Sequence, residues 1–236
     1  MEMPTAENPV VVHNGDCLDL LPRLGGVDVV VTDPPFGIGL ASHSPGACMD
    51  GSERKRCRKT AIANDHDTTV AEAVIRWADW QELPLVVFAS PYRPLPGPWR
   101  NVLVWNKGPA VGGGGDPATC WKRTFELIYT RRNKPLACGR DEAVLPFPVN
   151  TGADFKFHPC QKPVGLLRYL IRQLTRPGDL ILDPFAGSGS LGVAALLEGR
   201  RAILIERESA YCDIIRRRLD HASGTGAGSL FAGATN

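Results

Sequence analysis

The chain has 236 residues, of which 43% are hydrophobic and 22% are charged, so it is long enough for one sizeable core and is not generally disordered. The formal net charge of +2 indicates no particular class of partner, and no apolar run is long enough to span a membrane. The N-terminus lacks the features of a secretory signal, and the seven cysteines form no C-x-x-C pair, so we expect reduced thiols in a cytoplasmic protein.

Short apolar runs that are bounded by Gly, Pro, Asn or charged residues predict six β-strands. The strands are expected at residues 29–33, 85–90, 101–105, 125–132, 180–185 and 201–206. Several of these runs have no polar face, as is typical of strands that are covered by helices on both sides.

Apolar residues at helical spacing predict helices between these strands, at residues 68–80, 162–174 and 190–199. Pro163 suits a first helical turn, and Gly199 suits a C-terminal cap. The alternation of strands and helices predicts an open, mostly parallel α/β sheet with helices on both faces.

The remaining stretches follow neither period. Residues 37–62 are basic, residues 107–121 are rich in glycine and predict a flexible loop, and residues 133–157 are polar with three prolines. We therefore expect a single domain over residues 1–221 and a flexible tail over residues 222–236.

A glycine-rich turn joins the predicted strand that ends in "LILD" to the next helix. Gly187 and Gly189 allow a tight turn and a close approach by a ligand, the helix that starts near Ser190 offers free N–H groups, and Glu206 ends the following strand. An acid at this distance is suited to bind ribose hydroxyls. The spacing predicts a nucleoside site and leaves open whether the ligand is a dinucleotide or S-adenosylmethionine.

Four motifs resemble those of one enzyme family. "DPFAGSG" resembles the D-P-F-x-G-x-G cofactor motif of DNA amino-methyltransferases, and "TDPPF" resembles their D-P-P-[YF] catalytic motif. "HPCQKP" and the opening "NGDCLDLL" resemble two further elements of one subgroup. The catalytic motif comes first, which is the circularly permuted order of the β-group in the N4-cytosine/N6-adenine DNA methylase family. The resemblance covers about residues 10–220 and implies a Rossmann-like, S-adenosylmethionine-dependent methyltransferase fold.

The resemblance also implies which residues act. The predicted catalytic turn consists of Asp33, Pro34, Pro35 and Phe36. An exocyclic amine is a poor nucleophile, so Asp33 and the Pro34 carbonyl would accept its two N–H groups while Phe36 stacks on the flipped base. No metal is required. The predicted cofactor residues are Asp16, His158, Lys162, Asp183, Phe185, Ala186, Gly187, Ser188, Gly189, Ser190 and Glu206.

Some of these residues have an equally simple structural interpretation. Asp16 is implied to lie near the adenine of the cofactor, yet a helix N-cap fits equally well. Lys162 is implied to pair with the cofactor carboxylate, and Phe185 suits either the cofactor or the core. Glu126 receives no catalytic role, because Phe125 replaces the residue that usually precedes it. A zinc site formed by His43, Cys48, Cys57 and His66 matches no familiar spacing.

The expected substrate is double-stranded DNA, and target recognition is expected from residues 37–62 and 107–157. The product is predicted to be N6-methyladenine. N4-methylcytosine and a non-catalytic DNA-binding module are the alternatives, the permuted order disfavours RNA or protein substrates, and a homodimer is left open. Phosphate contacts are expected from Arg54, Lys55, Arg56, Arg58, Lys59, Lys122 and Arg123, with Arg131 and Arg132 on the same face.

Overall fold

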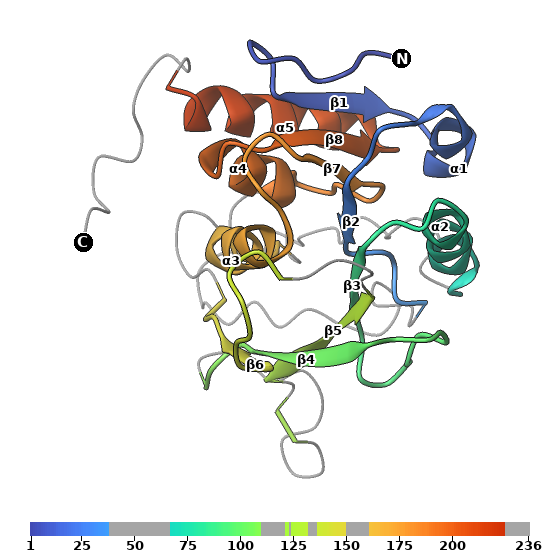
Figure 1. Ribbon diagram of the computed structural model, residues 1–236, viewed down its shortest axis with the longest axis vertical. Coiled ribbons are helices and arrows are strands. Elements are labelled where there is room, and N and C mark those ends of the chain that lie inside the picture. Colours follow the sequence, from blue (N-terminus) through green and yellow to red (C-terminus); the bar gives the residue numbers. More distant parts are fainter. Residues whose placement is uncertain (38–66, 110–120, 123, 132–135, 150–160, 225–236) are drawn as a thin grey trace, which may run out of the picture.

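The computed structural model describes residues 1–37, 67–109, 121–122, 124–131, 136–149 and 161–224. Within them, eight strands form one sheet in the order β1-β8-β7-β2-β3-β5-β4-β6 (Figure 1). The strands are β1 (Val10–Asn14), β2 (Val29–Thr32), β3 (Leu85–Ala89), β4 (Asn101–Asn106), β5 (Phe125–Arg131), β6 (Val144–Pro146), β7 (Leu180–Asp183) and β8 (Arg201–Glu206).

Only β5 runs against the other strands of this sheet. It pairs antiparallel with β3 and β4, whereas every other neighbouring pair of described strands is parallel. The mostly parallel α/β sheet that the sequence predicts is therefore confirmed.

Helices cover both faces of the sheet, also as predicted (Figure 1). One face carries α1 (Cys17–Leu20), a 3₁₀ turn (Leu21–Arg23) and α2 (Thr69–Trp80), and the other carries α3 (Val164–Leu174), α4 (Ser190–Leu197) and α5 (Ser209–Ala222). No helix in the described part of the chain is long and apolar enough to cross a membrane.

The valines of β2 show why the sequence of this strand is almost entirely apolar. Val29 and Val31 belong to the core cluster that contains residues of α3 and α4, whereas Val30 belongs to the cluster that contains residues of α2. Alternate side chains of a strand point to opposite faces, so a central strand needs apolar residues at every position.

The predicted boundaries need several corrections. The sequence did not predict β1, β6 or α5, and β6 lies inside the stretch that was expected to be irregular. Pro163 precedes the first turn of α3 instead of lying in it, whereas Gly199 follows α4 with a φ of 65°, as a C-terminal cap requires. In α5 only Cys212 and Ile215 are buried, which leaves too narrow an apolar stripe to stand out in the sequence.

The centre of the sheet contains a topological switch point. β7 and β2 are neighbours, and the chain continues from β7 into α4 on one face and from β2 towards α2 on the other. A crevice forms outside the carboxyl ends of parallel strands at such a point, and it is the usual ligand site of open α/β sheets. The Asp33 turn and the glycine-rich turn both begin there.

Candidate functional site

Asp33 follows the last residue of β2 and is held by a lysine from a distant part of the chain. Lys162 lies just before α3 begins, and its Nζ atom is 2.6 Å from Asp33 Oδ2. The other oxygen, Asp33 Oδ1, is buried and has no hydrogen-bond partner among the described residues. Asp33 therefore offers an acceptor that the surrounding protein does not use.

Lys162 also belongs to a longer row of alternating charges. Its Nζ atom lies 3.2 Å from Glu126 Oε2 on β5, and Glu126 Oε1 lies 2.5 Å from Lys107 Nζ, just beyond β4. The antiparallel register places Trp105 opposite Glu126, which brings Lys107 close to the glutamate. Glu126, to which the sequence assigned no role, thus lies in the site.

Aromatic rings surround the Lys162 ammonium group. Nζ lies 5.6 Å from the ring centroid of Phe36, 5.1 Å from that of Phe88 and 5.8 Å from that of Trp105. Only 8% of the Lys162 side chain is exposed. A cation within about 6 Å of a ring centroid is attracted electrostatically, so the rings favour the charged form.

Burial and the neighbouring cations have opposite effects on the two carboxyl groups. Burial raises the pKa of Asp33, and the nearby Lys162 ammonium only partly offsets this rise. For Glu126 burial also acts to raise the pKa, but Lys162 and Lys107 together bring it below its usual value. Glu126 is therefore the more firmly ionised of the two.

A hydrogen bond links the two turns at the switch point. Thr32 Oγ1 donates to Asp183 Oδ1 over 2.7 Å, and Phe185 N donates to the same oxygen over 3.1 Å. Burial raises the pKa of Asp183 to about 7, although both hydrogen bonds act to lower it. Asp183 thus holds the ends of β2 and β7 together.

The glycine-rich turn has the geometry that its sequence predicts. Gly187 and Gly189 have φ values of 52° and 78°, which side chains rarely adopt, and a Cβ atom on Gly189 would lie 2.7 Å from Ile215. Glu206 accepts hydrogen bonds from Gly187 N and Glu208 N, each over 2.8 Å. The acid and the turn therefore adjoin one another.

Arg218 of α5 stabilises this turn in a way that the sequence did not reveal. Its Nη1 atom donates to the Ser188 carbonyl over 2.5 Å, to Ser188 Oγ over 3.1 Å and to Ser190 Oγ over 3.3 Å. The sequence assigned Arg218 no role, because the helix that carries it was not predicted.

The other predicted residues have mixed outcomes. Asp16 caps α1 by accepting from Leu18 N over 2.9 Å, so its N-cap role is confirmed, while its contact with a cofactor stays a prediction. Phe185 packs partly buried against the core cluster on the α2 side. His158, Arg123, Arg132, the basic residues Arg54 to Lys59 and the suggested zinc residues lie outside the described residues.

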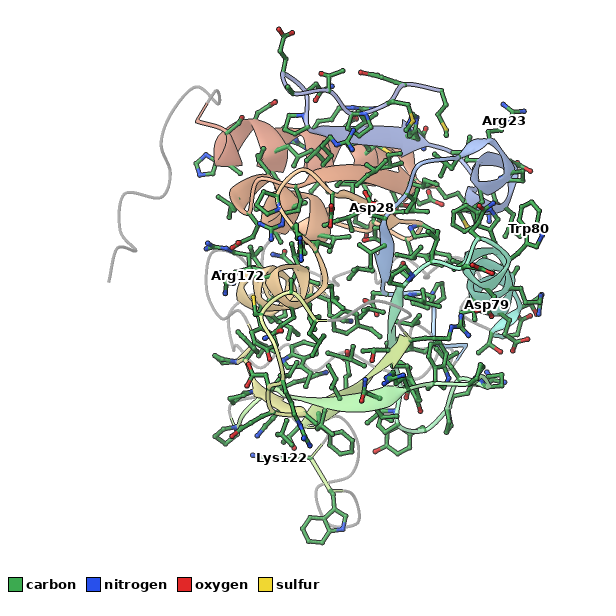
Figure 2. The ribbon with its side chains drawn as sticks, in the orientation of Figure 1. Arg23, Asp28, Asp79, Trp80, Lys122 and Arg172 are labelled. Carbon is green, nitrogen blue, oxygen red and sulfur yellow. The ribbon has the colours of Figure 1, made fainter. Side chains whose placement is uncertain are left out.

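Two of the basic residues assigned to a DNA face can be located. Lys122 is exposed and lies beyond β4 at one end of the molecule (Figure 2). Arg131 pairs with Asp79 of α2, stacks over Trp99 and has only 16% of its side chain exposed. It ends β5 beside the start of β3, at the edge of the sheet away from Asp33, so its assignment to a common DNA face is wrong.

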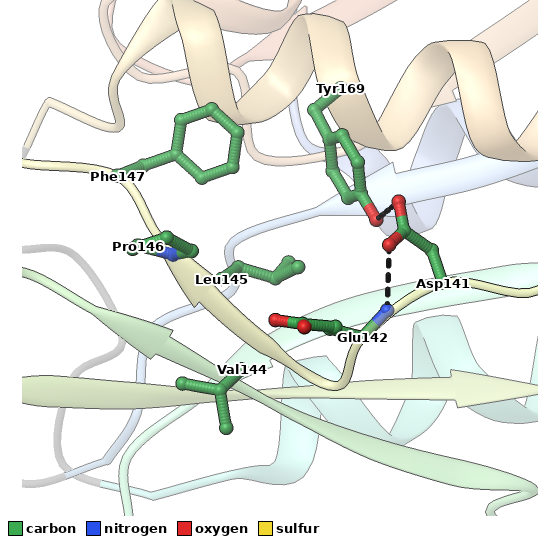
Figure 3. Close-up of a pocket in the computed structure, with 7 residues that line it drawn as sticks. All are labelled: Asp141, Glu142, Val144, Leu145, Pro146, Phe147 and Tyr169. Atoms are coloured by element: carbon green, nitrogen blue, oxygen red, sulfur yellow. Dashed lines mark hydrogen bonds between the residues drawn. The ribbon is translucent and has the colours of Figure 1, made fainter.

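A pocket of about 190 Å³ lies between β6 and α3 (Figure 3). There Tyr169 Oη donates to Asp141 Oδ2 over 2.8 Å, and Glu142 N donates to Asp141 Oδ1 over the same distance. Burial and this bond raise the pKa of Tyr169 to about 12. The Asp141 carboxylate of this pocket is therefore already paired.

Comparison with known proteins identifies methylases that resemble this chain in sequence. A family model described as DNA methylase matches residues 102–217. The DNA adenine methyltransferase YhdJ of Escherichia coli K12 is 46% identical over 109 residues, which are 44% of this chain and 37% of YhdJ. The putative methylase YubD of the same organism is 28% identical over 214 residues, which are 87% of this chain and 88% of YubD.

Solved structures share the fold at low sequence identity. The M1.HpyAVI–SAM complex has a TM-score of 0.64 at 19% identity and covers 89% of this chain and 99% of its own. The cytosine-N4-specific PvuII DNA methyltransferase has a TM-score of 0.60 at 16% identity, and the match covers 92% of this chain and 94% of the PvuII enzyme. The predicted methyltransferase fold is therefore confirmed, and over the matched residues the chain is similar to the N6/N4 DNA methylase family.

Proposed function

We propose that the chain transfers a methyl group from S-adenosylmethionine to the exocyclic amine of a base flipped out of double-stranded DNA, with adenine N6 as the acceptor. The observation that carries the proposal is the meeting of two turns at the switch point. The Asp33 turn follows β2, the Gly187–Gly189 turn follows the adjacent β7, and the Thr32–Asp183 hydrogen bond joins them.

The residues at the second turn fit an S-adenosylmethionine cofactor. Apart from its chain neighbours, Gly187 has no atom of the described residues within 4 Å of the position of a Cβ, so its backbone is open to a ligand, and α4 begins three residues later. Gly187, Gly189 and Ser190 would hold the cofactor beside Glu206, whose carboxylate is suited to ribose hydroxyls. When bound, the cofactor would supply an electrophilic methyl group.

The residues of the first turn would prepare the target amine. The lone pair of this amine is delocalised into the base, so acceptors on its N–H groups are needed to make it available. Asp33 Oδ1 is unbonded in the described structure and can accept one of them. Phe36 would stack on the flipped base and partly offset a cost of about a few kcal/mol for its extrusion.

Two considerations favour adenine over cytosine as the target. The resemblance implies that enzymes with cytosine specificity more often have Ser at the position of Asp33. The relative YhdJ is described as a DNA adenine methyltransferase and is 46% identical over the aligned 109 residues.

The test is a transfer assay with labelled S-adenosylmethionine and unmodified double-stranded DNA, followed by digestion to nucleosides. Labelled N6-methyladenine is the expected product. Labelled N4-methylcytosine would instead support cytosine specificity. Cofactor and DNA binding without transfer on any tested DNA would favour a DNA-binding module that has lost catalysis.

A further inference from the structure

Lys162 lies beside the residue that receives the substrate in the proposed function. It contacts the carboxylates of Asp33 and Glu126 at 2.6 and 3.2 Å, and three aromatic rings surround it. A lysine that is 92% buried keeps its charge only if paired anions compensate for the lost hydration. The surroundings of Lys162 supply that compensation.

The charges that face Asp33 show how much depends on this one ammonium group. Four charged groups act on Asp33 electrostatically, and each comes from a different element. They are Lys162 before α3, Glu126 on β5, Lys107 just beyond β4 and Asp183 at the end of β7. Lys162 is the largest of the influences that lower the pKa of Asp33, while burial and Glu126 raise it. Without Lys162, Asp33 would be a buried carboxylate beside two other acids.

We propose that Lys162 is a positioning residue for methyl transfer, which pairs with Asp33 Oδ2 to keep the carboxylate ionised and leaves Oδ1 to accept the N–H of the target amine. The inference rests on the proposed function. When the methyl group moves from the sulfonium to the amine nitrogen, that nitrogen must lose one proton, and Asp33 can accept it only while it is ionised. Glu126 lies 3.2 Å from the same ammonium group and pairs in turn with Lys107.

This assignment differs from the one that the family resemblance implies, in which Lys162 pairs with the carboxylate of the cofactor. In the structure the ammonium group already has two carboxylate neighbours within the protein. The two assignments make opposite predictions for a variant that lacks the charge, because only one of them requires a large loss of cofactor affinity.

The first experiment measures the titration of the Asp33 carboxyl group by ¹³C NMR, with the signal assigned from Asp33→Asn. In Lys162→Met the pKa of Asp33 should rise by about one to three units. In Lys162→Arg this pKa should stay close to its value in the unaltered protein, because the positive charge is kept. The control is Glu198→Gln, which removes a charged side chain that is about as buried as that of Lys162. Glu198 pairs with Arg168 and Arg172 instead of with Asp33. It should leave the Asp33 signal unchanged.

The second experiment compares cofactor affinity and the pH profile of a single turnover. In Lys162→Met the acid limb should move to higher pH, while cofactor affinity should change by less than about threefold. A fall in affinity of about tenfold or more with an unchanged Asp33 titration would assign Lys162 to the cofactor and overturn the proposal.

A further variant covers the case in which Lys162→Met does not fold. Glu126→Gln removes one negative charge near Asp33, so the pKa of Asp33 should fall, and an unchanged value would contradict the proposed coupling. The NMR titration needs no turnover. Lack of methyl transfer by the unaltered protein would therefore refute the proposed function. The titration would still show separately whether Lys162 keeps Asp33 ionised.

Discussion

Asp33 occupies an environment that is unfavourable for a carboxylate and that the proposed reaction needs. Burial raises its pKa, and one of its oxygens has no partner in the described structure, although an unpaired buried acceptor costs about 1–3 kcal/mol. Such an arrangement is common where a group must bind a substrate instead of its neighbours in the protein. The strongest functional signal of the turn is therefore the incomplete pairing of Asp33.

The Asp33→Ala variant should bind S-adenosylmethionine with unchanged affinity and lose methyl transfer by about 10²-fold or more, because no carboxylate then accepts the amine N–H. Calorimetry would measure the affinity, and single-turnover transfer to DNA would measure the rate. The control is Asp141→Ala, since Asp141 is an exposed acid that bonds Tyr169 away from the turn. Near-normal transfer by Asp33→Ala would remove Asp33 from the mechanism.

At the scale of elements, the pairing of β2 with β7 depends on a carboxyl group whose protonation changes near neutral pH. Asp183 ends β7, is 6% exposed and accepts the Thr32 hydroxyl from β2. Burial is the largest cause of its raised pKa of about 7. The folded protein therefore binds this proton more tightly than the unfolded chain, in which the pKa returns to about 3.9.

The sign of the resulting stability change is fixed by this difference. The contribution of Asp183 is fully present below about pH 4 and is lost as the pH rises through about 7. Relative to Asp183→Asn, the free energy of unfolding should fall by at most about 1.4 kcal/mol per pH unit across that range. Urea unfolding of both proteins at several pH values would measure it, and a difference that stays constant with pH would contradict the raised pKa.

The elements that the sequence predicts well are those whose periodicity is local. β2, β7 and β8 are apolar on both faces and were found, whereas α5 was missed because Cys212 and Ile215 give too weak a stripe. Both turns were also predictable, since each is a contiguous motif. The pair of Lys162 with Asp33 was not, because the residues are 129 positions apart and only the three-dimensional fold brings them together.

At the scale of the whole molecule, the near-neutral net charge means that DNA binding depends on where the positive charges lie. Gly37 and Asp67 flank the segment that contains Arg54 to Lys59, which is itself outside the described residues. A Cβ atom on Gly37 would lie 2.6 Å from the Asp67 carbonyl carbon, and Arg93 donates to the Gly37 carbonyl. The described residues on either side of residues 38–66 therefore adjoin one another close to the Asp33 turn.

We predict that this segment contacts phosphates and does not select the sequence. Each phosphate contact by Lys or Arg releases counterions and steepens the fall of log affinity with log salt by about one unit. Neutralising Arg54, Lys55 and Arg56 together should therefore weaken binding to every DNA and flatten the salt slope by up to about three units. The methylated sequence should stay the same, because base contacts and not phosphate contacts carry specificity.

The matched control neutralises three exposed arginines that precede β2, β6 and β7, namely Arg23, Arg140 and Arg176. They precede these strands in the chain, whereas Asp33 follows β2, so their replacement by Gln should leave the salt slope unchanged although it removes the same charge. An equal loss of DNA affinity in both triple variants would mean that net charge alone governs DNA binding. A changed methylation motif after the first replacement, read by long-read sequencing, would instead assign Arg54, Lys55 and Arg56 to base recognition.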